Sequence, residues 1–454
     1  MAKTDAAPVT RLFGTDGVRG KAGTFPLDHT TVRRLGAALV RALPHGTESP
    51  HLLIGRDTRE SGGWIEAELA HGAGGEGASV TSVGVVPTPA VAYLTRANAE
   101  YDAGVVISAS HNPFEDNGIK VFSGRGEKFT EKVEREIEAI VADTSWTTRD
   151  GSPEEVQGAE LVNDYLDHLC AVLPDPSVFK GFKLVIDCAN GATTPVAPGL
   201  FRSLGFDVTV IGDQPDGRNI NLACGSTHPE GLAKAVVDTG AKMGVAFDGD
   251  GDRAIFVDHK GRVVNGDAVL LMCARYLQRE NRLPGNAIVA TVMSNIGLEI
   301  ALKHSNITIV RTPVGDKYVM EEMLAKGIAL GGEQSGHVIF SEYLFTGDGL
   351  CSALNVLKAV AASGRTLADL SDDLVNYPQV LLNVRVREKV DLGTVPACAE
   401  VIANVESRVA GQGRLLVRYS GTEPLLRVML EGRDQDEIKA WAQEIIDVVK
   451  RELA

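Results

Sequence analysis

Three widely separated segments of the chain share one pattern. A short apolar run, beginning at Leu52, Leu184 or Ile288, leads into a polar or glycine-containing turn, and a helix-compatible stretch follows. This alternation predicts α/β layers built on parallel strands. The repeats are too far apart for a solenoid, whose period is roughly 20–50 residues. We therefore expect three similar α/β domains.

The C-terminal part of the chain has a different pattern. Apolar residues alternate along 381–386, and further strands are expected at 415–417 and 425–430. A final helix places the apolar residues of 438–449 on one face. These elements predict a small α+β domain that closes the chain. A length of 454 residues supports three or four domains, and we place them at 1–157, 158–258, 259–372 and 373–454.

Composition excludes several classes of protein. The formal net charge is −15 with no block of Lys or Arg, so a nucleic acid is an unfavourable partner. No run of about 18 apolar residues exists, and none follows Met1, which argues against a membrane span or a signal peptide. The six cysteines are scattered without a Cys-x-x-Cys pair. We therefore expect reduced thiols in the cytoplasm rather than a disulfide framework or a zinc site.

A serine stands at the end of a predicted buried strand. The strand Gly104–Ile107 delivers Ser110, inside the sequence Ser-Ala-Ser-His-Asn-Pro, to its C-terminal end, where α/β sheets usually bind ligands. Ser110 is a candidate nucleophile, although no Gly-x-Ser-x-Gly elbow surrounds it. Lys120 follows closely enough to fold back as a general acid and base. A turn that only shapes the backbone before Pro113 is the alternative.

Three aspartates follow another short apolar strand, Val245–Phe247. Asp248, Asp250 and Asp252 alternate with glycines, and their carboxylates repel one another unless a cation lies between them. Hard oxygen ligands suit Mg²⁺ or Ca²⁺. An EF-hand is excluded because its sixth and twelfth positions would be Arg253 and His259. The pattern predicts a magnesium site completed by phosphate or water, with a solvated acidic turn as the alternative.

Two further loops carry binding chemistry. Gly331–His337 combines Glu, Ser and His with glycines, a composition that suits the hydroxyl groups of a sugar but also an ordinary polar turn. Arg418–Pro424, with Arg427 beyond it, offers two guanidinium groups, two hydroxyls and a glycine. Such a set can cradle a phosphate, although arginines beside a turn are often merely solvated.

In their order along the chain, these four loops and the opening Phe13–Gly20 resemble the α-D-phosphohexomutase family over essentially the whole length. The resemblance implies an isomerase with three similar α/β domains of mixed sheets plus the α+β domain, around a central active-site cleft. The four domains would carry, in turn, the phosphoserine, metal, sugar and phosphate loops.

The resemblance also implies roles for individual residues. Ser110 would carry the phosphoryl group, and Asp248, Asp250 and Asp252 would hold Mg²⁺ together with the Ser110 phosphate. The implied catalytic set is Ser110, Lys120, His111, Arg253 and Arg19. The implied sugar-binding set is Glu333, Ser335, His337 and Gly315. The implied phosphate-binding set is Arg418, Ser420, Gly421, Thr422 and Arg427.

Three features are similar to the branch of the family that acts on glucosamine phosphates: the opening Phe13–Gly20, the stretch Pro215–Asn221 followed by Cys224–His228, and Gln334. This resemblance implies exchange of glucosamine 6-phosphate and glucosamine 1-phosphate through a 1,6-bisphosphate. The product would feed UDP-N-acetylglucosamine and peptidoglycan precursors. Mg²⁺, an activating hexosamine or glucose 1,6-bisphosphate and phosphorylation of Ser110 are the implied cofactors. Sugar phosphates are the expected partners, and a homodimer is compatible with the resemblance.

Three other functions stay open at this point. A phosphomannomutase or phosphoglucomutase of the same family differs only in its sugar. A phosphatase could share the aspartate loop, but its nucleophile would normally be an aspartate, leaving Ser110 and Lys120 without a role. A non-catalytic protein that binds metal or sugar phosphate would change neither ligand.

Overall fold

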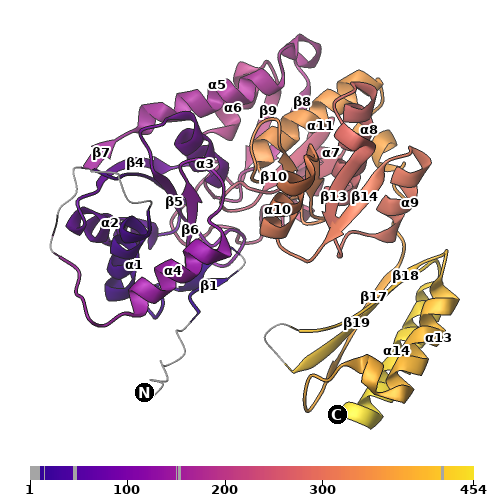
Figure 1. The fold of residues 1–454 in the computed structure, drawn as a ribbon. Coiled ribbons are helices and arrows are strands. Elements are labelled where there is room, and N and C mark those ends of the chain that lie inside the picture. The colour runs from indigo at the N-terminus through magenta and orange to yellow at the C-terminus, as the bar shows by residue number, and fades with distance from the viewer. Residues whose placement is uncertain (1–10, 15, 44–48, 150, 152–154, 421–423) are drawn as a thin grey trace, which may run out of the picture. The chain divides into compact units, whose positions relative to one another are not determined.

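The computed structural model describes residues 11–14, 16–43, 49–149, 151, 155–420 and 424–454. Within these residues the chain divides into two compact units (Figure 1). The first unit takes residues up to 293 and 307–372, and the second takes 294–306 and everything from 373 onward. Four sheets, each with its own helices, make up the predicted four-domain α/β fold, which is confirmed.

The first sheet is mixed and has seven strands, in the order β1-β2-β6-β5-β3-β4-β7. The strands β3, β4, β5 and β7 run parallel, whereas β1, β2 and β6 join antiparallel. Its strands are β1 (Phe13–Gly14), β2 (Gly17–Lys21), β3 (His51–Arg56), β4 (Ser79–Val85), β5 (Ala103–Ile107), β6 (Asp116–Ser123) and β7 (Glu155–Gln157). Its helices are α1 (His29–Ala42), α2 (Gly62–Gly75), α3 (Thr88–Ala97) and α4 (Glu131–Ala142).

The second sheet has the order β12-β11-β10-β8-β9. Its strands are β8 (Lys183–Asp187), β9 (Asp207–Ile211), β10 (Met243–Phe247), β11 (Ala254–Asp258) and β12 (Val263–Val264). The helices of this part are α5 (Val162–Val172), α6 (Ala197–Ser203) and α7 (Glu230–Thr239). The turn after Asp258, where we placed a domain boundary, joins β11 to β12 as a hairpin. The second sheet therefore continues to Val264.

The third sheet has the order β14-β13-β15-β16. Its strands are β13 (Ala287–Thr291), β14 (Thr308–Thr312), β15 (Leu330–Gly332) and β16 (Val338–Phe340). The helices here are α8 (Gly266–Arg279), α10 (Asp316–Lys326), α11 (Gly349–Ser363) and α12 (Leu367–Ser371). The strand β15 begins at Leu330 and continues through two glycines of the predicted sugar loop. An added Cβ on Gly331 would lie 2.5 Å from the Met323 sulfur of α10, so α10 packs closely on this strand.

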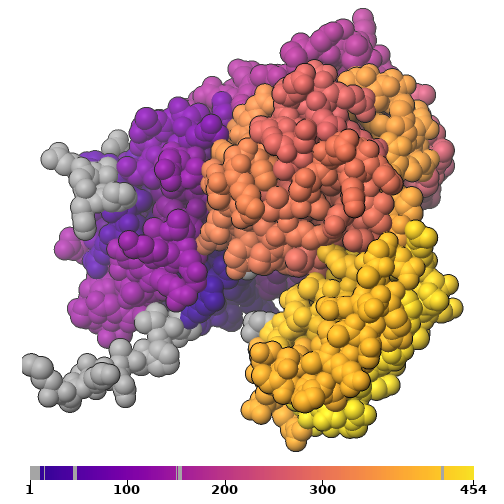
Figure 2. Space-filling view, turned by 45° about the vertical axis from the view of Figure 1, so that its right-hand side comes forward, coloured from indigo at the N-terminus to yellow at the C-terminus, as the bar shows by residue number. Residues whose placement is uncertain are grey.

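Within the first unit, the sheets and their helices form three layers, numbered like the sheets, and the first and third layers contact each other directly. In the space-filling view, the purple surface that includes α4 abuts the orange surface that includes α10 (Figure 2). Lys317 of α10 donates to Glu134 of α4 at 2.8 Å, and Lys128 pairs with Asp316 at the start of α10. Both ion pairs are largely buried, so they join the first and third layers.

The second unit has one antiparallel sheet, in the order β17-β19-β18. Its strands are β17 (Gln379–Arg385), β18 (Arg414–Tyr419) and β19 (Leu425–Glu431), and its helices are α9 (Ile296–His304), α13 (Pro396–Val409) and α14 (Gln435–Leu453). The helices α13 and α14 cover one face of this sheet (Figure 1). The apolar face of α14 includes Ile438, Ile445 and Val449, all buried, as its periodicity predicts.

Candidate active site

Ser110 lies directly beyond β5, a strand whose residues are all buried. The Ser110 side chain is also fully buried. Its Oγ donates to Asp248 Oδ2 at 2.5 Å and lies 3.3 Å from Nδ1 of His111. The Ser110 φ is +52°, in the left-handed region that a non-glycine residue adopts only when its surroundings hold it there. The structure therefore brings the predicted nucleophile to the predicted metal loop.

The aspartate loop follows β10 at the carboxyl end of the second sheet. One carboxylate oxygen from each of Asp248, Asp250 and Asp252 lies within 4.8 Å of the others, and all three residues are buried. Glycine is required between them, because an added Cβ on Gly249 would lie 2.5 Å from the Ser110 carbonyl oxygen. The serine and aspartate loops thus touch through their backbones.

This donor set fits a hard divalent cation. Burial and the neighbouring charges of Asp252 and Asp250 raise the pKa of Asp248 well above its usual range. Among the described residues, Oδ1 of Asp250 and Oδ1 of Asp252 are buried without a hydrogen-bond partner. Buried carboxylate oxygens are rarely left unpaired. Three such carboxylates, with water or phosphate completing the shell, suit Mg²⁺.

Lys120 reaches the same loop from β6, the antiparallel neighbour of β5. Its Nζ lies 2.7 Å from Asp250 Oδ2 and 3.1 Å from both Asp252 Oδ2 and Asp16 Oδ2. Burial disfavours the charged ammonium, but these three carboxylates outweigh it and raise the Lys120 pKa well above its usual range. Ser110 and Lys120 therefore both contact the aspartate loop. Ser110 contacts Asp248, and Lys120 contacts Asp250 and Asp252.

The three remaining predicted catalytic residues surround this group. Burial and then the positive charges of Arg253 and Arg19 lower the pKa of His111, which favours its neutral form. Arg19 pairs with Asp16. Among the described residues, Nε of Arg19 and Nε of Arg253 are buried without a hydrogen-bond partner. These two guanidinium groups therefore have donors left for an anionic ligand.

Two of the predicted sugar-binding residues open into a hollow. A cavity of about 370 Å³ is lined by Arg253, Thr291, Met293, Val314, Glu333, Gln334 and Ser335. Glu333 accepts from the Gly315 backbone at 3.1 Å and from the Ser335 hydroxyl at 3.4 Å. Although Gln334 lines the cavity, its amide donates to Asp267 at 3.2 Å.

His337 has different surroundings from the rest of its loop. It is buried, with Nδ1 3.6 Å from Asp252 Oδ1, and its Nε2 accepts from the Gly347 amide at 3.0 Å. The acceptor role of Nε2 places the ring proton on Nδ1, toward the aspartate loop. His337 therefore faces the predicted metal ligands.

The predicted phosphate loop belongs to the second unit. Arg418 of β18 and Arg427 of β19 are direct cross-strand partners. Ser420 is buried, and its carbonyl oxygen accepts from Lys389 at 2.7 Å. Gly421 and Thr422 lie outside the described residues. Side chains of direct cross-strand partners lie on the same face of the sheet, and two like charges placed there are destabilising unless an anion lies near them.

Several residues of the site received no individual role from the sequence. Thr88, at the start of α3, donates to Asp250 Oδ2 at 2.5 Å. Asp16 lies between Lys120, Lys128 and Arg19. The one usable hint for Asp16 is its place in the opening motif Phe13–Gly20. Arg59 and Asn221 contact the backbone of the serine loop from two directions.

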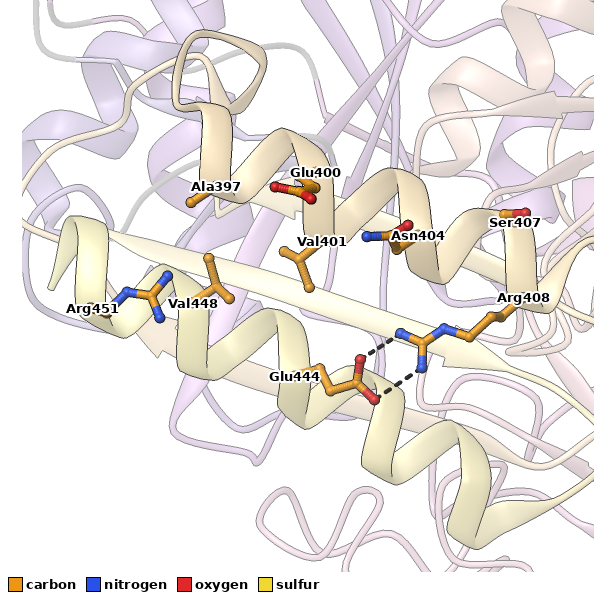
Figure 3. A pocket seen from close by; sticks show the side chains of 9 residues that line it. All are labelled: Ala397, Glu400, Val401, Asn404, Ser407, Arg408, Glu444, Val448 and Arg451. Carbon is orange, nitrogen blue, oxygen red and sulfur yellow. Dashed lines mark hydrogen bonds and ion pairs between the residues drawn. The ribbon is translucent and has the colours of Figure 1, made fainter.

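A second hollow, of about 550 Å³, lies between α13 and α14. Figure 3 shows Arg408 and Glu444 facing each other across it, joined by two hydrogen bonds of 3.0 and 2.5 Å. None of the predicted site residues lines it.

Comparison with known proteins agrees with the four sheets. Models of phosphoglucomutase/phosphomannomutase alpha/beta/alpha domains I, II and III match residues 10–148, 163–261 and 265–377, and the model of its C-terminal domain matches 381–448. No helix among the described residues is long and apolar enough to cross a membrane.

Individual relatives cover almost the whole chain. The phosphoglucosamine mutase of Solibacter usitatus is 51% identical over 97% of this chain and 99% of its own. That of Geotalea daltonii is 45% identical over 98% of each. The structure of a phosphoglucomutase/phosphomannomutase family protein from Burkholderia thailandensis superposes with a TM-score of 0.78 at 25% identity, covering 96% of this chain and 97% of the other.

A solved structure with an amino-sugar ligand shares the fold. The N-acetylphosphoglucosamine mutase of Aspergillus fumigatus, in complex with GlcNAc-6P and magnesium, has a TM-score of 0.66 at 19% identity, over 98% of this chain and 96% of its own. Together with the four matched domains and the near full-length relatives, the assembled loops show that this chain belongs to the phosphoglucomutase/phosphomannomutase family of sugar-phosphate mutases.

Proposed function

We propose that this chain interconverts glucosamine 6-phosphate and glucosamine 1-phosphate, with Ser110 as the phosphoryl carrier and glucosamine 1,6-bisphosphate as the intermediate. The observation that carries the role of Ser110 is its Oγ, 2.5 Å from a carboxylate of the buried Asp triad, on a backbone held at a φ of +52°. The choice of sugar is supported by near full-length relatives, 45–51% identical, that are named phosphoglucosamine mutases.

Asp248, Asp250 and Asp252 would hold Mg²⁺. The buried Oδ1 of Asp250, which has no hydrogen-bond partner among the described residues, supports this role, as does the magnesium in the complex of the Aspergillus mutase. When bound, the ion supplies positive charge that stabilises a phosphoryl group in transfer. The domain boundaries at 157 and 372 are part of the same proposal, with one loop of the site on each domain. The boundary expected at 258 is moved to follow Val264, because the β11–β12 hairpin spans it.

Lys120, His111, Arg253 and Arg19 would serve the transfer itself. Lys120 holds a proton at Nζ, and we assign it the exchange of that proton with the sugar oxygen that gains or loses the phosphoryl group. In the forward step the bond from phosphorus to Ser110 Oγ breaks and a bond from phosphorus to the free sugar oxygen forms. The proton of that sugar hydroxyl passes, by way of Lys120, to Ser110 Oγ, and the return step reverses this transfer. Arg253 and Arg19 have unused donors for the phosphate oxygens.

Binding of the rest of the substrate is divided between two loops. Glu333, Ser335, His337 and Gly315 would fix the sugar, and the cavity beside Arg253 gives it room. Arg418 and Arg427, opposite each other on β18 and β19, would hold the non-reacting phosphate. Ser420, Gly421 and Thr422 complete that set through the family resemblance. The bisphosphate must turn end for end, so either phosphate has to fit this loop.

The proposal also covers the setting of the reaction. The expected location is the cytoplasm, and the expected activator is hexosamine or glucose 1,6-bisphosphate, the latter bound in another Aspergillus structure of the same fold. Sugar phosphates are the expected partners, with a homodimer as the assembly to test. The product would supply UDP-N-acetylglucosamine for peptidoglycan precursors.

Substrate choice is tested by phosphorus NMR. The protein is incubated with Mg²⁺, a trace of glucose 1,6-bisphosphate and either glucosamine, glucose or mannose 6-phosphate. We expect glucosamine 1-phosphate to form fastest, total sugar phosphate to stay constant and EDTA to stop the reaction. Faster turnover of glucose or mannose phosphate would overturn the assigned sugar. Release of inorganic phosphate would indicate a phosphatase.

A further inference from the structure

The backbone of the serine loop is held by two side chains from different parts of the chain. The Ser110 carbonyl oxygen accepts from Asn221 Nδ2 at 2.9 Å and from Arg59 Nη2 at 3.3 Å. The Asn112 carbonyl oxygen accepts from the same two groups, at 3.2 and 2.6 Å. Asn221 and Arg59 thus each donate to the two backbone carbonyls that flank His111.

Arg59 comes from the turn after β3 and is 1% exposed. It pairs with Asp57, and its Nε donates to the Asp116 carbonyl at 2.8 Å, so the guanidinium spans both ends of the serine loop. Asp57 also accepts from Ser108 Oγ at 2.5 Å, and Ser108 Oγ accepts from the Ser110 amide at 2.9 Å. Both the amide and the carbonyl of Ser110 are therefore tied to the Asp57–Arg59 pair.

Asn221 reaches the loop from the second layer of the same unit. It is buried, and its own φ is +58°, a conformation that Asn tolerates better than most residues. Its segment also contacts the turn that holds Arg59, because the Glu60 amide donates to the Gly217 carbonyl at 3.0 Å. Through Asn221, the predicted metal-binding domain contacts the backbone of the predicted phosphoserine, Ser110.

We infer that Asn221 and Arg59 are positioning residues that fix the Ser110 backbone so that Oγ faces the Asp triad. A left-handed φ is unfavourable for a non-glycine residue, and the hydrogen bonds to both peptide groups of Ser110 hold that conformation. Neither Asn221 nor Arg59 lines the cavity beside Glu333. Their loss should therefore impair transfer rather than sugar binding. The inference rests on the proposed role of Ser110.

Two substitutions at Asn221 separate a donor from a space-filling role. Asn221→Ala removes the side chain, whereas Asn221→Asp keeps its shape but replaces the donor with a carboxylate oxygen. We expect kcat to fall about 10- to 100-fold in both, because small misplacements of reacting groups cost that much, with KM changed less than about threefold. Asn219→Ala is the matched control, since among the described residues that side chain bonds Asp216 and Gln214 of its own segment and none of the serine loop. We expect its kcat to stay near the wild-type value.

The assay uses whichever sugar phosphate the wild-type protein isomerises, and intact mass gives the phosphorylated fraction. Wild-type kcat in Asn221→Asp, an equal loss in Asn219→Ala, or a change confined to KM would each overturn the inference. Ser110→Ala is run alongside. Full activity in Ser110→Ala would refute the proposed carrier, and the positioning role with it. An inactive Ser110→Ala beside fully active Asn221 variants would refute only the positioning role.

Discussion

Individual residues of the site divide into those that sequence reasoning could find and those that it could not. Ser110 and the three aspartates were found because they follow short apolar strands, where an α/β sheet exposes its loops. Arg59 was missed, and Asn221 was noted only as part of Pro215–Asn221 and given no role, because their partners are backbone carbonyls of the serine loop, far away along the chain. Any residue can supply a carbonyl, so such contacts carry no residue-type signal.

Asp348 is a buried carboxyl group whose protonation should affect stability. It accepts from the Cys351 amide as the N-cap of α11 and from the Tyr165 hydroxyl, at 2.9 Å each. Burial raises its pKa from 3.8 to about 6. Between these values the folded state binds more protons than the unfolded state, so this group makes stability fall as pH rises.

Asp348→Asn should remove that pH dependence, because Asn caps a helix equally well and does not ionise. Relative to the wild type, the free energy of unfolding of the variant should rise between pH 4 and 6, by up to about 3 kcal/mol. Urea denaturation of both proteins at several pH values measures the difference. Parallel curves for the two proteins would contradict the assigned titration.

Secondary-structure elements could be predicted where the sequence has a continuous apolar run, typical of a buried strand, or a long apolar face at helical spacing. The strands at 52–56, 184–187 and 288–291 and the final helix are present as expected. Gly331 and Gly332 were assigned to the loop 331–337 because they look like turn residues, yet they lie in β15 against α10. Glycine selected for close packing cannot be told from glycine selected for a turn without the packing partner.

One buried carboxylate connects three elements of the second unit. Glu431 of β19 pairs with Arg414 of β18 at 2.8 Å and accepts from the Ile296 amide of α9 at 3.2 Å. Glu431→Ala should destabilise this unit by about 3–5 kcal/mol, because it leaves a largely buried guanidinium without its carboxylate. Hydrogen exchange of β17–β19 peptides in the full chain measures the loss of protection.

The exposed pair between α13 and α14 provides the control for that measurement. Arg408 and Glu444 are 38% and 46% exposed (Figure 3), so solvent screens their interaction. Glu444→Ala should cost less than about 1 kcal/mol. An equal loss of stability in Glu431→Ala and Glu444→Ala would show that burial does not determine how much each ion pair contributes to stability.

At the scale of the whole molecule, the number of domains could be predicted but the assembly of the site could not. Strand–turn–helix spacing indicated separate α/β domains, and the four matched domain models agree with that number. The contacts of Lys120 with Asp250 and Asp252 join the first sheet to the second. Such contacts depend on how whole layers pack, which no local pattern specifies.

The most direct test follows one phosphoryl group. The protein is labelled with glucose 1,6-bisphosphate carrying radioactive phosphate, the label is located by peptide mapping, and unlabelled glucosamine 6-phosphate is then added with Mg²⁺ and quenched within one turnover. We predict that the label lies on Ser110 and moves into glucosamine 1,6-bisphosphate at least as fast as kcat, and that Ser110→Ala takes up no label. Label that stays on the protein during turnover, or that leaves as inorganic phosphate, would contradict a phosphoserine mutase.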